Sequence, residues 1–357
     1  MRVTLRTPPL KRQSGTTRHA VALAEGLRKA GAAVAVEQEL HFEMKLGSRW
    51  IGGDMSARLG RLWPPRRADV VHATTLYCNP TLRSADVVTV HDVMPVSHPE
   101  LYGSSDKGVA KMLAKIRRVL RRGCLHVTTR HVQAEIEEYV MGADRALLPV
   151  VPHGLDHGRF FPDPGPDPAL FPGRMNILVV AQHERRKRVD VLLEAVRDLP
   201  FVRVLQVGPK QPPPLHQAMA AKVWEAAAPL VTQGRYEHLG VVDDPRLRRL
   251  LSSADVVVAP SVAEGFGWPP LEALACGAKV VASDIPPHRE VLGDAVRYSA
   301  VDALLLQEGL DNLWDGEQVR EELFPPMAER LAQAGKYTWE RHIEGMLGVY
   351  EMAAGRR

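Results

Sequence analysis

Two glutamates flank a glycine-rich turn whose residue types could hold a sugar or a ribose. Glu264 precedes Gly265-Phe266-Gly267, and Glu272 follows within 270–276, an apolar segment expected to be a helix. A carboxylate accepts hydrogen bonds from hydroxyls, glycines admit close backbone approach, and helix starts bind anions. We therefore expect a phosphorylated sugar here, with Glu264 in the loop and Glu272 in the first helical turn. By itself, Gly-x-Gly fits an ordinary turn between solvated glutamates equally well.

A basic run follows the strand expected over 176–181 and could neutralise a leaving phosphate. The run starts at Gln182, reads Arg185-Arg186-Lys187-Arg188 and leads into a helix expected over 189–197. Cations at a helix start are unfavourable unless an anion joins them. We therefore expect an anion at this place, while a solvated helix start remains the alternative.

Short β-branched runs that alternate with helical patterns must position these segments. Buried strands that alternate with helices form parallel sheets with helices on both faces. The expected strands are 3–5, 33–36, 70–72, 87–90, 125–128, 147–151, 176–181, 202–207, 239–242, 256–259 and 279–282. A helix is expected over 17–30, and Gly31 ends it. The fold class is therefore α/β, with doubly wound, Rossmann-like parallel sheets.

The strand–helix pattern is interrupted once, by a segment dense in proline, glycine and aspartate. Neither a strand nor a regular helix tolerates that many prolines. We read the interruption as a linker between two domains, and ligands of such sheets bind beyond the carboxyl ends of the strands. The expected divisions are an N-terminal domain over 1–160, a linker over 161–174, a C-terminal domain over 175–335 and a final helix over 336–357.

The stretch from Asp255 to Gly277 resembles the glutamate-x7-glutamate signature of retaining GT-B glycosyltransferases of family 4, the glycosyl transferases group 1. The similarity continues through 277–286 and 290–295. Three further segments resemble parts of the same family. The family's interdomain junction resembles Val151-Pro152-His153-Gly154-Leu155-Asp156, and the start of its closing helix resembles Trp339-Glu340. Its first-domain motif resembles Val90-His91-Asp92. The resemblance implies two Rossmann-like domains that face each other across a cleft, with the closing helix returning to the first domain.

The resemblance also assigns roles to the residues around the two glutamates. Glu264 would orient the transferred sugar, Glu272 would hold the ribose, and the backbone of Gly265, Phe266 and Gly267 would contact the donor. Lys187 matches the lysine that clamps the diphosphate. The family's arginine position is Gln182 here, so Arg186 or Arg185 would have to substitute for it.

Three more residues receive roles by resemblance alone. His91 would lie near the transferred sugar, although an isolated histidine is more often structural. Gly15 is what remains of a Gly-Gly pair that contacts the donor phosphates, and a plain capping loop is the alternative there. Val242, after Gly240, would lie beside the nucleotide base.

Together these features imply a hexosyltransferase that uses a nucleotide-diphosphate sugar, GDP-mannose or a UDP-hexose. The acceptor would be a hydroxyl of a glycan or lipid-linked molecule in cell-surface polysaccharide synthesis. In the family the acceptor attacks the sugar from the same face as the departing phosphate, so the configuration at the anomeric carbon is retained. No Asp-x-Asp follows a strand, so we expect neither metal nor cofactor. A nucleotide-sugar-binding module without turnover and a GT-B sugar-nucleotide epimerase remain alternatives.

Composition narrows the classes of protein to which this chain could belong. The chain has 357 residues, enough for two domains, and a net charge of +4. Its three cysteines are scattered, and no His/Cys cluster stands close in sequence, so neither disulfides nor zinc are expected. No apolar run is long enough to cross a bilayer, and the first residues do not read as a signal peptide. We expect a cytoplasmic protein.

The segment 105–122 concentrates basic residues on one helical face and apolar residues on another. A basic amphipathic helix can lie on an anionic membrane, and many members of the family act on lipid-linked acceptors. The protein could therefore bind the inner membrane face peripherally through this helix. An ordinary surface helix that packs inward is the alternative, and we do not expect nucleic acid as a partner.

Overall fold

Two parallel sheets organise the chain, and each lies in a unit of its own. The computed structural model describes residues 1–7, 15–38, 41–46, 49–54, 68–76, 85–165, 167–211 and 214–356. The first unit comprises 1–99, 104–154 and 338–357, and the second comprises 100–103 and 155–337.

The sheet of the first unit has the strand order β2-β1-β5-β6-β7, and all of its pairs are parallel. Its strands are β1 (Arg2–Thr7), β2 (Ala33–Gln38), β5 (Val70–Ala73), β6 (Val87–Val90) and β7 (Cys124–Val127). Every residue of the three strands β5, β6 and β7 is buried. Strands buried on both faces are mostly apolar at successive positions, which explains why each of these strands has only one polar residue, His72, Thr89 or His126.

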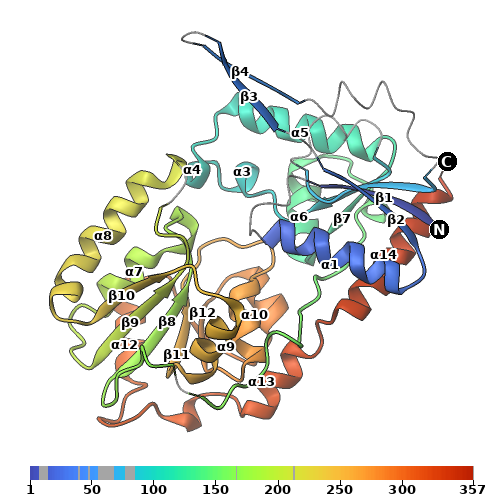
Figure 1. Ribbon diagram of the computed structural model, residues 1–357. Coiled ribbons are helices and arrows are strands. Elements are labelled where there is room, and N and C mark those ends of the chain that lie inside the picture. The colour runs from blue at the N-terminus through green and yellow to red at the C-terminus, as the bar shows by residue number, and fades with distance from the viewer. Residues whose placement is uncertain are drawn as a thin grey trace. The chain divides into compact units, whose positions relative to one another are not determined.

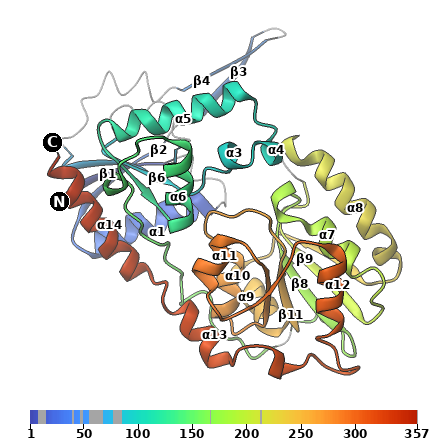
Figure 2. The same cartoon turned by 180° about the vertical axis from the view of Figure 1, so that it is seen from behind.

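Helices cover both faces of this first sheet (Figures 1 and 2). Helices α1 (Gly15–Lys29) and α14 (Trp339–Ala354) share one apolar core with β1, and α5 (Asp106–Leu120) and α6 (Arg130–Tyr139) share another with β6 and β7. The smaller elements are an antiparallel pair β3 (His41–Leu46) and β4 (Arg49–Asp54), and the short helices α3 (Met94–Ser97) and η2 (Arg145–Leu147). The short helix α4 (Pro99–Tyr102) begins in the first unit, but its other residues belong to the second. The last helix of the chain thus belongs to the unit that contains the first strand.

The sheet of the second unit has the order β10-β9-β8-β11-β12-β13, again with parallel pairs throughout. Its strands are β8 (Met175–Val180), β9 (Val202–Val207), β10 (Tyr236–Gly240), β11 (Val256–Ala259), β12 (Val280–Ser283) and β13 (Arg297–Ser299). Strands β9 and β10 follow β8 toward one edge, and β12 and β13 follow β11 toward the other. The direction of winding therefore reverses between β8 and β11, the place where open α/β sheets bind ligands.

The helices of the second unit form two layers, one on each face of this sheet (Figures 1 and 2). The first layer holds α7 (Val189–Ala195), α8 (Gln217–Thr232) and α12 (Ala303–Asp311). The second layer holds α9 (Asp244–Ser253), α10 (Trp268–Ala275), α11 (Pro286–Leu292) and α13 (Met327–Ala334). The remaining short elements are η3 (Arg185–Lys187), η4 (Pro214–His216) and η5 (Glu321–Leu323). The predicted α/β class with two doubly wound parallel sheets is confirmed.

One predicted strand, 147–151, is wrong. The structure has η2 up to Leu147 and then a single parallel bridge between Val150 and Val127. Pro149 and Pro152 flank this bridge and lack the N–H that a strand needs on each side. The strand predicted over 239–242 also ends earlier, at Gly240, whose φ of 77° turns the chain away.

The boundary between the units differs from the predicted linker. It lies at Gly154 and Leu155, and the proline-rich segment belongs entirely to the second unit. The described residues of the segment form no strand or helix, as predicted, and its acids hold it on α9. Asp163 pairs with Arg248 at 3.1 Å, and Asp167 pairs with Arg246 at 3.3 Å. Ion pairs between distant segments leave no periodic trace in a sequence.

No helix within the described ranges is long and apolar enough to cross a membrane. Cys124 and Cys276 are free and buried, and Cys78 lies outside the described residues.

Candidate functional site

Glu264 is the centre of an ionic cluster in the second unit. Lys187 donates from Nζ to Oε1 of Glu264 at 2.6 Å, and Arg186 donates from Nη1 to Oε2 at 2.7 Å. The Glu264 side chain is 9% exposed and that of Lys187 11%. Each carboxylate oxygen therefore has its own cationic partner in a largely dry environment, where charge-assisted hydrogen bonds are strong.

A second carboxylate completes this cluster, and the sequence analysis did not identify it. Glu184 accepts from Nε of Arg186 at 2.7 Å, and it also accepts a hydrogen bond from the side-chain amide of Gln182. Gln182, at the position where the family has an arginine, thus donates a hydrogen bond to an acid and supplies no positive charge. Glu184 precedes the basic run directly, and as the nearest acid to several cations it could have been noticed.

Burial and charge oppose each other at Glu264. Burial by itself would raise the pKa of this carboxyl, but the charges of Arg186 and Lys187 outweigh it and hold the pKa well below its usual range. For Lys187, burial and the charge of Arg186 lower the pKa, and Glu264 only partly offsets them. Glu264 therefore remains an anion, and an acceptor of hydrogen bonds, at any physiological pH.

The backbone fixes the basic loop against the segment before Glu264. The loop leaves β8, forms the short helix η3 and enters α7 through Arg188, whose φ of 45° reverses the chain. Val262 donates its N–H to the carbonyl of Arg186 at 2.8 Å. Arg185 differs from its neighbours, because its exposed side chain donates to the carbonyl of Glu100. Of the two arginines proposed as substitutes, only Arg186 shares Glu264 with Lys187 as a hydrogen-bond partner.

The glycine turn has a conformation that depends on Gly267. Its φ is 90°, and a Cβ atom there would lie 3.1 Å from Cδ2 of His288. His288 is fully buried and was not identified from the sequence. The Phe266 side chain is 5% exposed and packs against Tyr337 and Trp268. The ring of Phe266 is therefore part of the core and not available to a ligand.

Helix α10 starts earlier than predicted, and this changes the place of Glu272. The helix begins at Trp268, with Pro269 and Pro270 in its first turn. Glu272 therefore lies in the second turn, not in the first. It is buried, with 9% of its surface exposed, and belongs to the same loop–helix segment as Glu264.

A pocket opens where β8 and β11 end. It is lined by Val179, Val180, Ala181, Lys187, Val257, Val258, Ala259, Pro260, Ser261, Glu264, Pro269 and Pro270. The strands supply apolar walls, and the polar side chains come from the loops that follow them. This pocket lies at the reversal of the sheet and contains both of the residues expected to do most of the chemistry.

The remaining predicted residues lie elsewhere. Val242 follows the end of β10, which β9 separates from β8, and it packs half-buried against the core of the second layer. Gly15 is the first residue of α1 in the first unit, and the residues just before it lie outside the described part.

His91 also belongs to the first unit, directly after β6. Its Nε2 lies 3.0 Å from the carbonyl of Thr74, and its Nδ1 lies 3.1 Å from Nε2 of His153. Burial lowers its pKa to about 4, against which the hydrogen bond to Thr74 acts only partly. The imidazole is thus neutral, and both of its ring nitrogens are engaged within the first unit.

Comparison with known proteins places the second unit in a family. Residues 167–333 match the family described as glycosyl transferases group 1. These residues form a glycosyl transferases group 1 domain. This domain contains Gln182, Arg186, Lys187, Glu264 and Glu272, so the ionic cluster and the pocket both belong to it.

The phosphatidyl-myo-inositol mannosyltransferase of Mycolicibacterium smegmatis is 33% identical to this chain over 213 residues, which are 57% of this chain and 52% of that protein. The chain spans about half the length of the curated relatives it matches, 45 to 52% for three of them.

Solved structures cover both units. Sucrose-phosphate synthase from Thermosynechococcus elongatus has a TM-score of 0.79 at 18% identity and covers 99% of this chain and 98% of its own. Anabaena HepE in complex with UDP and glucose has a TM-score of 0.76 at 17% identity and covers 99% and 100%. The predicted GT-B fold is confirmed by these similarities.

Proposed function

We propose that this protein transfers a hexose from a nucleotide-diphosphate sugar to an acceptor hydroxyl. The observation that carries the proposal is the convergence of Arg186 and Lys187 on Glu264, in a pocket at the reversal of the second sheet. Open α/β sheets bind their ligands at this place. The group 1 glycosyltransferase domain coincides with the unit that contains this pocket, which supports sugar transfer as its chemistry.

The cluster divides the work between cations and carboxylates. Cleavage of the sugar–phosphate bond makes negative charge grow on the leaving diphosphate, and Lys187 and Arg186 would stabilise it. The two cations are balanced by Glu184 and Glu264, so they are positioned before the donor arrives and need little rearrangement. The N–H groups at the start of α10 would contribute further positive potential.

The carboxylates would hold the two sugar rings. Glu264 stays ionised in the pocket and can accept hydrogen bonds from hydroxyls of the transferred hexose. Glu272, in the second turn of α10, would accept from the ribose. Neither acid is placed as a covalent nucleophile in this proposal, and retention would follow from attack on the face that the phosphate leaves.

The donor classes that we propose are GDP-mannose and UDP-hexoses. A relative that is named as a mannosyltransferase supports the first, and a structural neighbour solved with UDP and glucose supports the second. The acceptor would be a glycan or a lipid-linked molecule of cell-surface polysaccharide synthesis on the cytoplasmic side of the membrane. Transfer would need no metal, because the cations of the cluster occupy the role that a metal otherwise has.

Helix α5 would bring the protein to an anionic membrane. Met112, Ile116 and Val119 are buried in the core of the first unit, so the apolar stripe supports that core and is not available for insertion. Lys107, Lys111, Arg118 and Arg122 are exposed. Membrane binding would therefore be purely electrostatic, at about 1 kcal/mol per basic residue near the surface.

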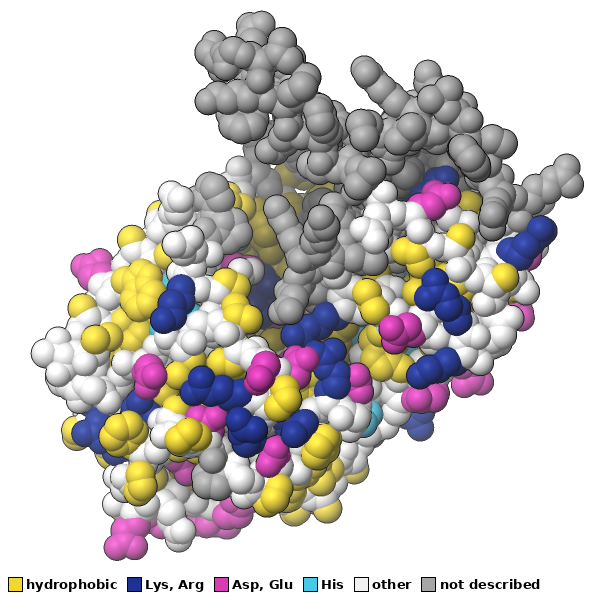
Figure 3. All heavy atoms as spheres, viewed as in Figure 1, with side chains coloured by type: hydrophobic (Ala, Val, Ile, Leu, Met, Phe, Trp, Pro, Cys, Tyr) yellow, Lys and Arg dark blue, Asp and Glu magenta, His cyan; other side chains and the backbone are white. Residues whose placement is uncertain are grey.

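Nucleic acid is not part of the proposal. In the view of Figure 3, side chains of Lys and Arg are interspersed with those of Asp and Glu on the described surface. Proteins that bind nucleic acid gather positive charge on one face instead.

A panel of donors tests the proposed function. The protein is incubated with GDP-mannose, UDP-glucose, UDP-galactose and UDP-N-acetylglucosamine, and its melting temperature and the release of nucleotide are measured with and without acceptor glycans. We expect one donor to stabilise the protein and to release its nucleotide in the presence of EDTA. Stabilisation without release would indicate the binding module, and conversion of one nucleotide-sugar into its epimer would indicate the epimerase; either result contradicts the proposal.

A separate co-sedimentation experiment tests membrane binding. We expect binding to vesicles that contain anionic lipid but not to neutral vesicles, and loss of binding when salt is raised, because the contact is electrostatic. A variant in which Lys107, Lys111 and Arg118 are changed to Gln should no longer bind. Equal binding of this variant, or binding to neutral vesicles, would contradict the proposed role of α5.

A further inference from the structure

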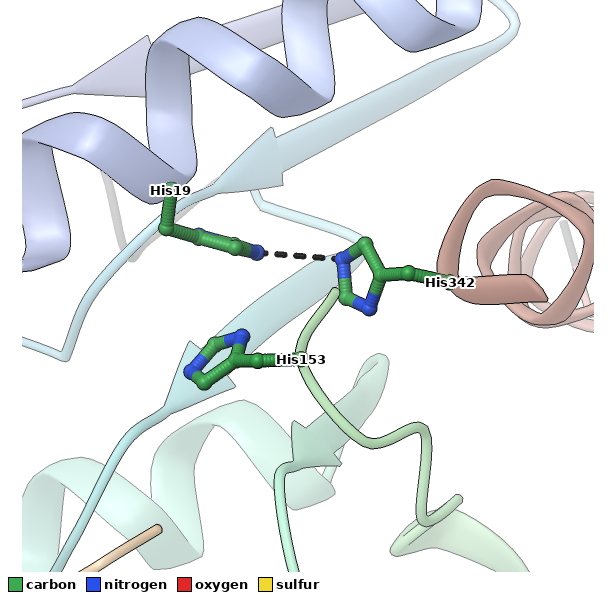
Figure 4. Close-up of side chains that lie close together, drawn as sticks. All are labelled: His19, His153 and His342. Carbon is green, nitrogen blue, oxygen red and sulfur yellow. Dashed lines mark hydrogen bonds between the residues drawn. The ribbon is translucent and has the colours of Figure 1, made fainter. Parts of the chain in front are cut away.

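Three histidines from distant parts of the chain meet inside the first unit. His19 lies on α1, His153 follows Pro152, and His342 lies on α14 (Figure 4). Their exposed fractions are 0%, 2% and 1%. Each offers a ring nitrogen, and these nitrogens lie within 4.8 Å of one another. The rings point toward a common centre from three separate backbone segments.

A backbone carbonyl fixes the tautomer of His342. The carbonyl oxygen of Pro152 lies 2.8 Å from its Nδ1 and accepts a hydrogen bond, so Nδ1 carries the proton. The lone pair of the neutral ring is then on Nε2, which lies 3.2 Å from Nε2 of His19. Metal-binding histidines almost always donate their other N–H to a carbonyl or carboxylate in this way.

The tautomer of His153 follows from a chain of two bonds. The carbonyl of Thr74 accepts from Nε2 of His91, which leaves Nδ1 of His91 as an acceptor. That nitrogen accepts from Nε2 of His153 at 3.1 Å. The lone pair of His153 is therefore on Nδ1. In both His342 and His153, one ring nitrogen thus donates a hydrogen bond that fixes the ring, and the other nitrogen carries the lone pair that can bind an ion.

His19 supplies the third nitrogen. In the absence of an ion, its Nε2 donates to the lone pair of His342, and its buried Nδ1 makes no hydrogen bond to any residue that the structure describes. Moving the proton from Nε2 to Nδ1 would free Nε2 for an ion without a change in charge. Burial lowers the pKa of all three rings, that of His342 to about 4, so they are neutral at physiological pH, as ligation requires.

The other buried histidines nearby are fully used in a separate chain of hydrogen bonds. Tyr350 donates to His72, His72 to Thr89, and Thr89 to His126, each at 2.8 Å. His126 donates in turn to the carbonyl of Val151 at 2.8 Å. One tautomer satisfies every ring nitrogen in this chain, so His72 and His126 have a structural role and no nitrogen left for an ion.

We propose that His19, His153 and His342 bind one zinc ion, with a water molecule as the fourth ligand, and that this ion ties α1, α14 and the segment around His153 together. Three imidazoles suit zinc, because zinc is a borderline-soft ion and imidazole nitrogens are ligands that it binds well. A tetrahedron with Zn–N bonds of about 2.0–2.1 Å has edges of about 3.3 Å, close to the 3.2 Å between the Nε2 atoms of His19 and His342. The nitrogen of His153 lies within 4.8 Å of the other two and would have to move closer to them when the ion binds.

This site is separate from the proposed transfer reaction, whose cluster lies in the second unit. The proposed zinc ion is structural: it fastens the closing helix to the unit that contains β1. Loss of transfer activity therefore does not test it, and its test uses metal binding and stability alone.

The test starts from protein produced without a histidine tag and dialysed against EDTA. Zinc is titrated in competition with a zinc-binding dye, and cobalt is titrated while the visible spectrum is recorded. We expect one ion per chain, the strong visible absorption of tetrahedral cobalt, and, at free zinc a hundredfold above Kd, a melting temperature raised by roughly 5 °C.

Matched variants show whether these three histidines bind the ion. His19→Gln, His153→Gln and His342→Gln should each weaken zinc binding by at least about a hundredfold, whereas His126→Gln, in the same core, should change it by less than about tenfold. Folding of each variant is checked by circular dichroism. Absence of one-to-one binding by the wild-type protein, octahedral cobalt bands, or equal losses in His126→Gln and the ligand variants would overturn the proposal. If a ligand variant does not fold, the wild-type cobalt spectrum decides by itself.

Discussion

Lys187 donates to Glu264 at 2.6 Å, although the two residues are 77 positions apart in the chain. The bond joins the loop after β8 to the loop after β11, across the place where the second sheet reverses. A cation and an anion are thus kept together in a pocket that has apolar walls, and no other lining residue in the described part of the chain is charged. The pair is the basis of the proposed function, and the first predictions address it.

Removing either partner of this pair should abolish most of the turnover. We expect Lys187→Ala and Glu264→Gln each to lower the rate of nucleotide release by at least about a hundredfold, the scale of one lost electrostatic contact with a transition state. The measurement is steady-state release with the donor that the panel identifies. Arg197→Ala, which removes a charge from an exposed side chain, is the control and should retain wild-type rates. Near-normal rates in both site variants would refute the assignment.

The two arginines before Lys187 should behave differently. Arg186 contacts Glu264 and Glu184, whereas Arg185 is exposed and contacts only a backbone carbonyl among the bonds that the structure defines for it. We expect Arg186→Ala to lower kcat/KM by about tenfold to a thousandfold and Arg185→Ala to change it by less than threefold, on the order of an ordinary surface substitution. A larger loss in Arg185→Ala would mean that the donor recruits this arginine.

Stability should fall as the solution becomes acidic, and His72 is one cause. Burial, with smaller contributions from His342 and His91, lowers its pKa from 6.5 to about 3. Below pH 6.5, His72 binds a proton in the unfolded chain but remains neutral in the folded protein. The contribution of this residue is therefore fully present above pH 6.5 and is lost as the pH falls toward 3, by up to about 1.4 kcal/mol per pH unit.

Urea unfolding in EDTA at pH 7.5 and pH 5 measures this effect. The wild-type protein should lose about 2 kcal/mol more than His72→Gln between the two pH values, because only the wild-type protein has this histidine to protonate on unfolding. His157→Gln, at an exposed position, should follow the wild-type protein. An equal pH dependence of wild type and His72→Gln would show that His72 is protonated in the folded state.

The turn before α10 should tolerate no side chain at Gly267. Its φ of 90° is unfavourable for alanine by about 1–2 kcal/mol, and the added Cβ would press on the buried His288. We expect Gly267→Ala to lower the free energy of unfolding by at least that amount and to weaken donor binding. Gly309→Ala is the control, because nothing lies within 4 Å of a Cβ there and the position is helical. That change should stabilise the protein by about 0.5–1 kcal/mol. Equal stability of wild type and Gly267→Ala would contradict the predicted strain.

Much of the fold could be predicted because its strands are buried on both faces. The runs 87–90, 202–207 and 256–259 became strands with those same bounds, since strands buried on both faces are rich in Val, Ile and Leu. The predictions failed where non-local contacts decide the structure. Pro149 and Pro152 left Val150 a single bridge instead of a strand, and ion pairs with α9 fixed a proline-rich segment that looked like a linker.

The sequence by itself determined the segment from Glu264 to Glu272 as a candidate site, because a motif of neighbouring residues is visible in one dimension. It also determined that Lys187 should meet an anion. Only the tertiary structure decided that this anion includes Glu264, that Arg186 rather than Arg185 is the second cation, and that Glu184 completes the cluster. The same holds for His19, His153 and His342, which lie more than a hundred positions apart and become neighbours only because α1 and α14 pack on one sheet. Residue types predict which chemistry is available, but folding alone sets the distances through which charges and lone pairs act.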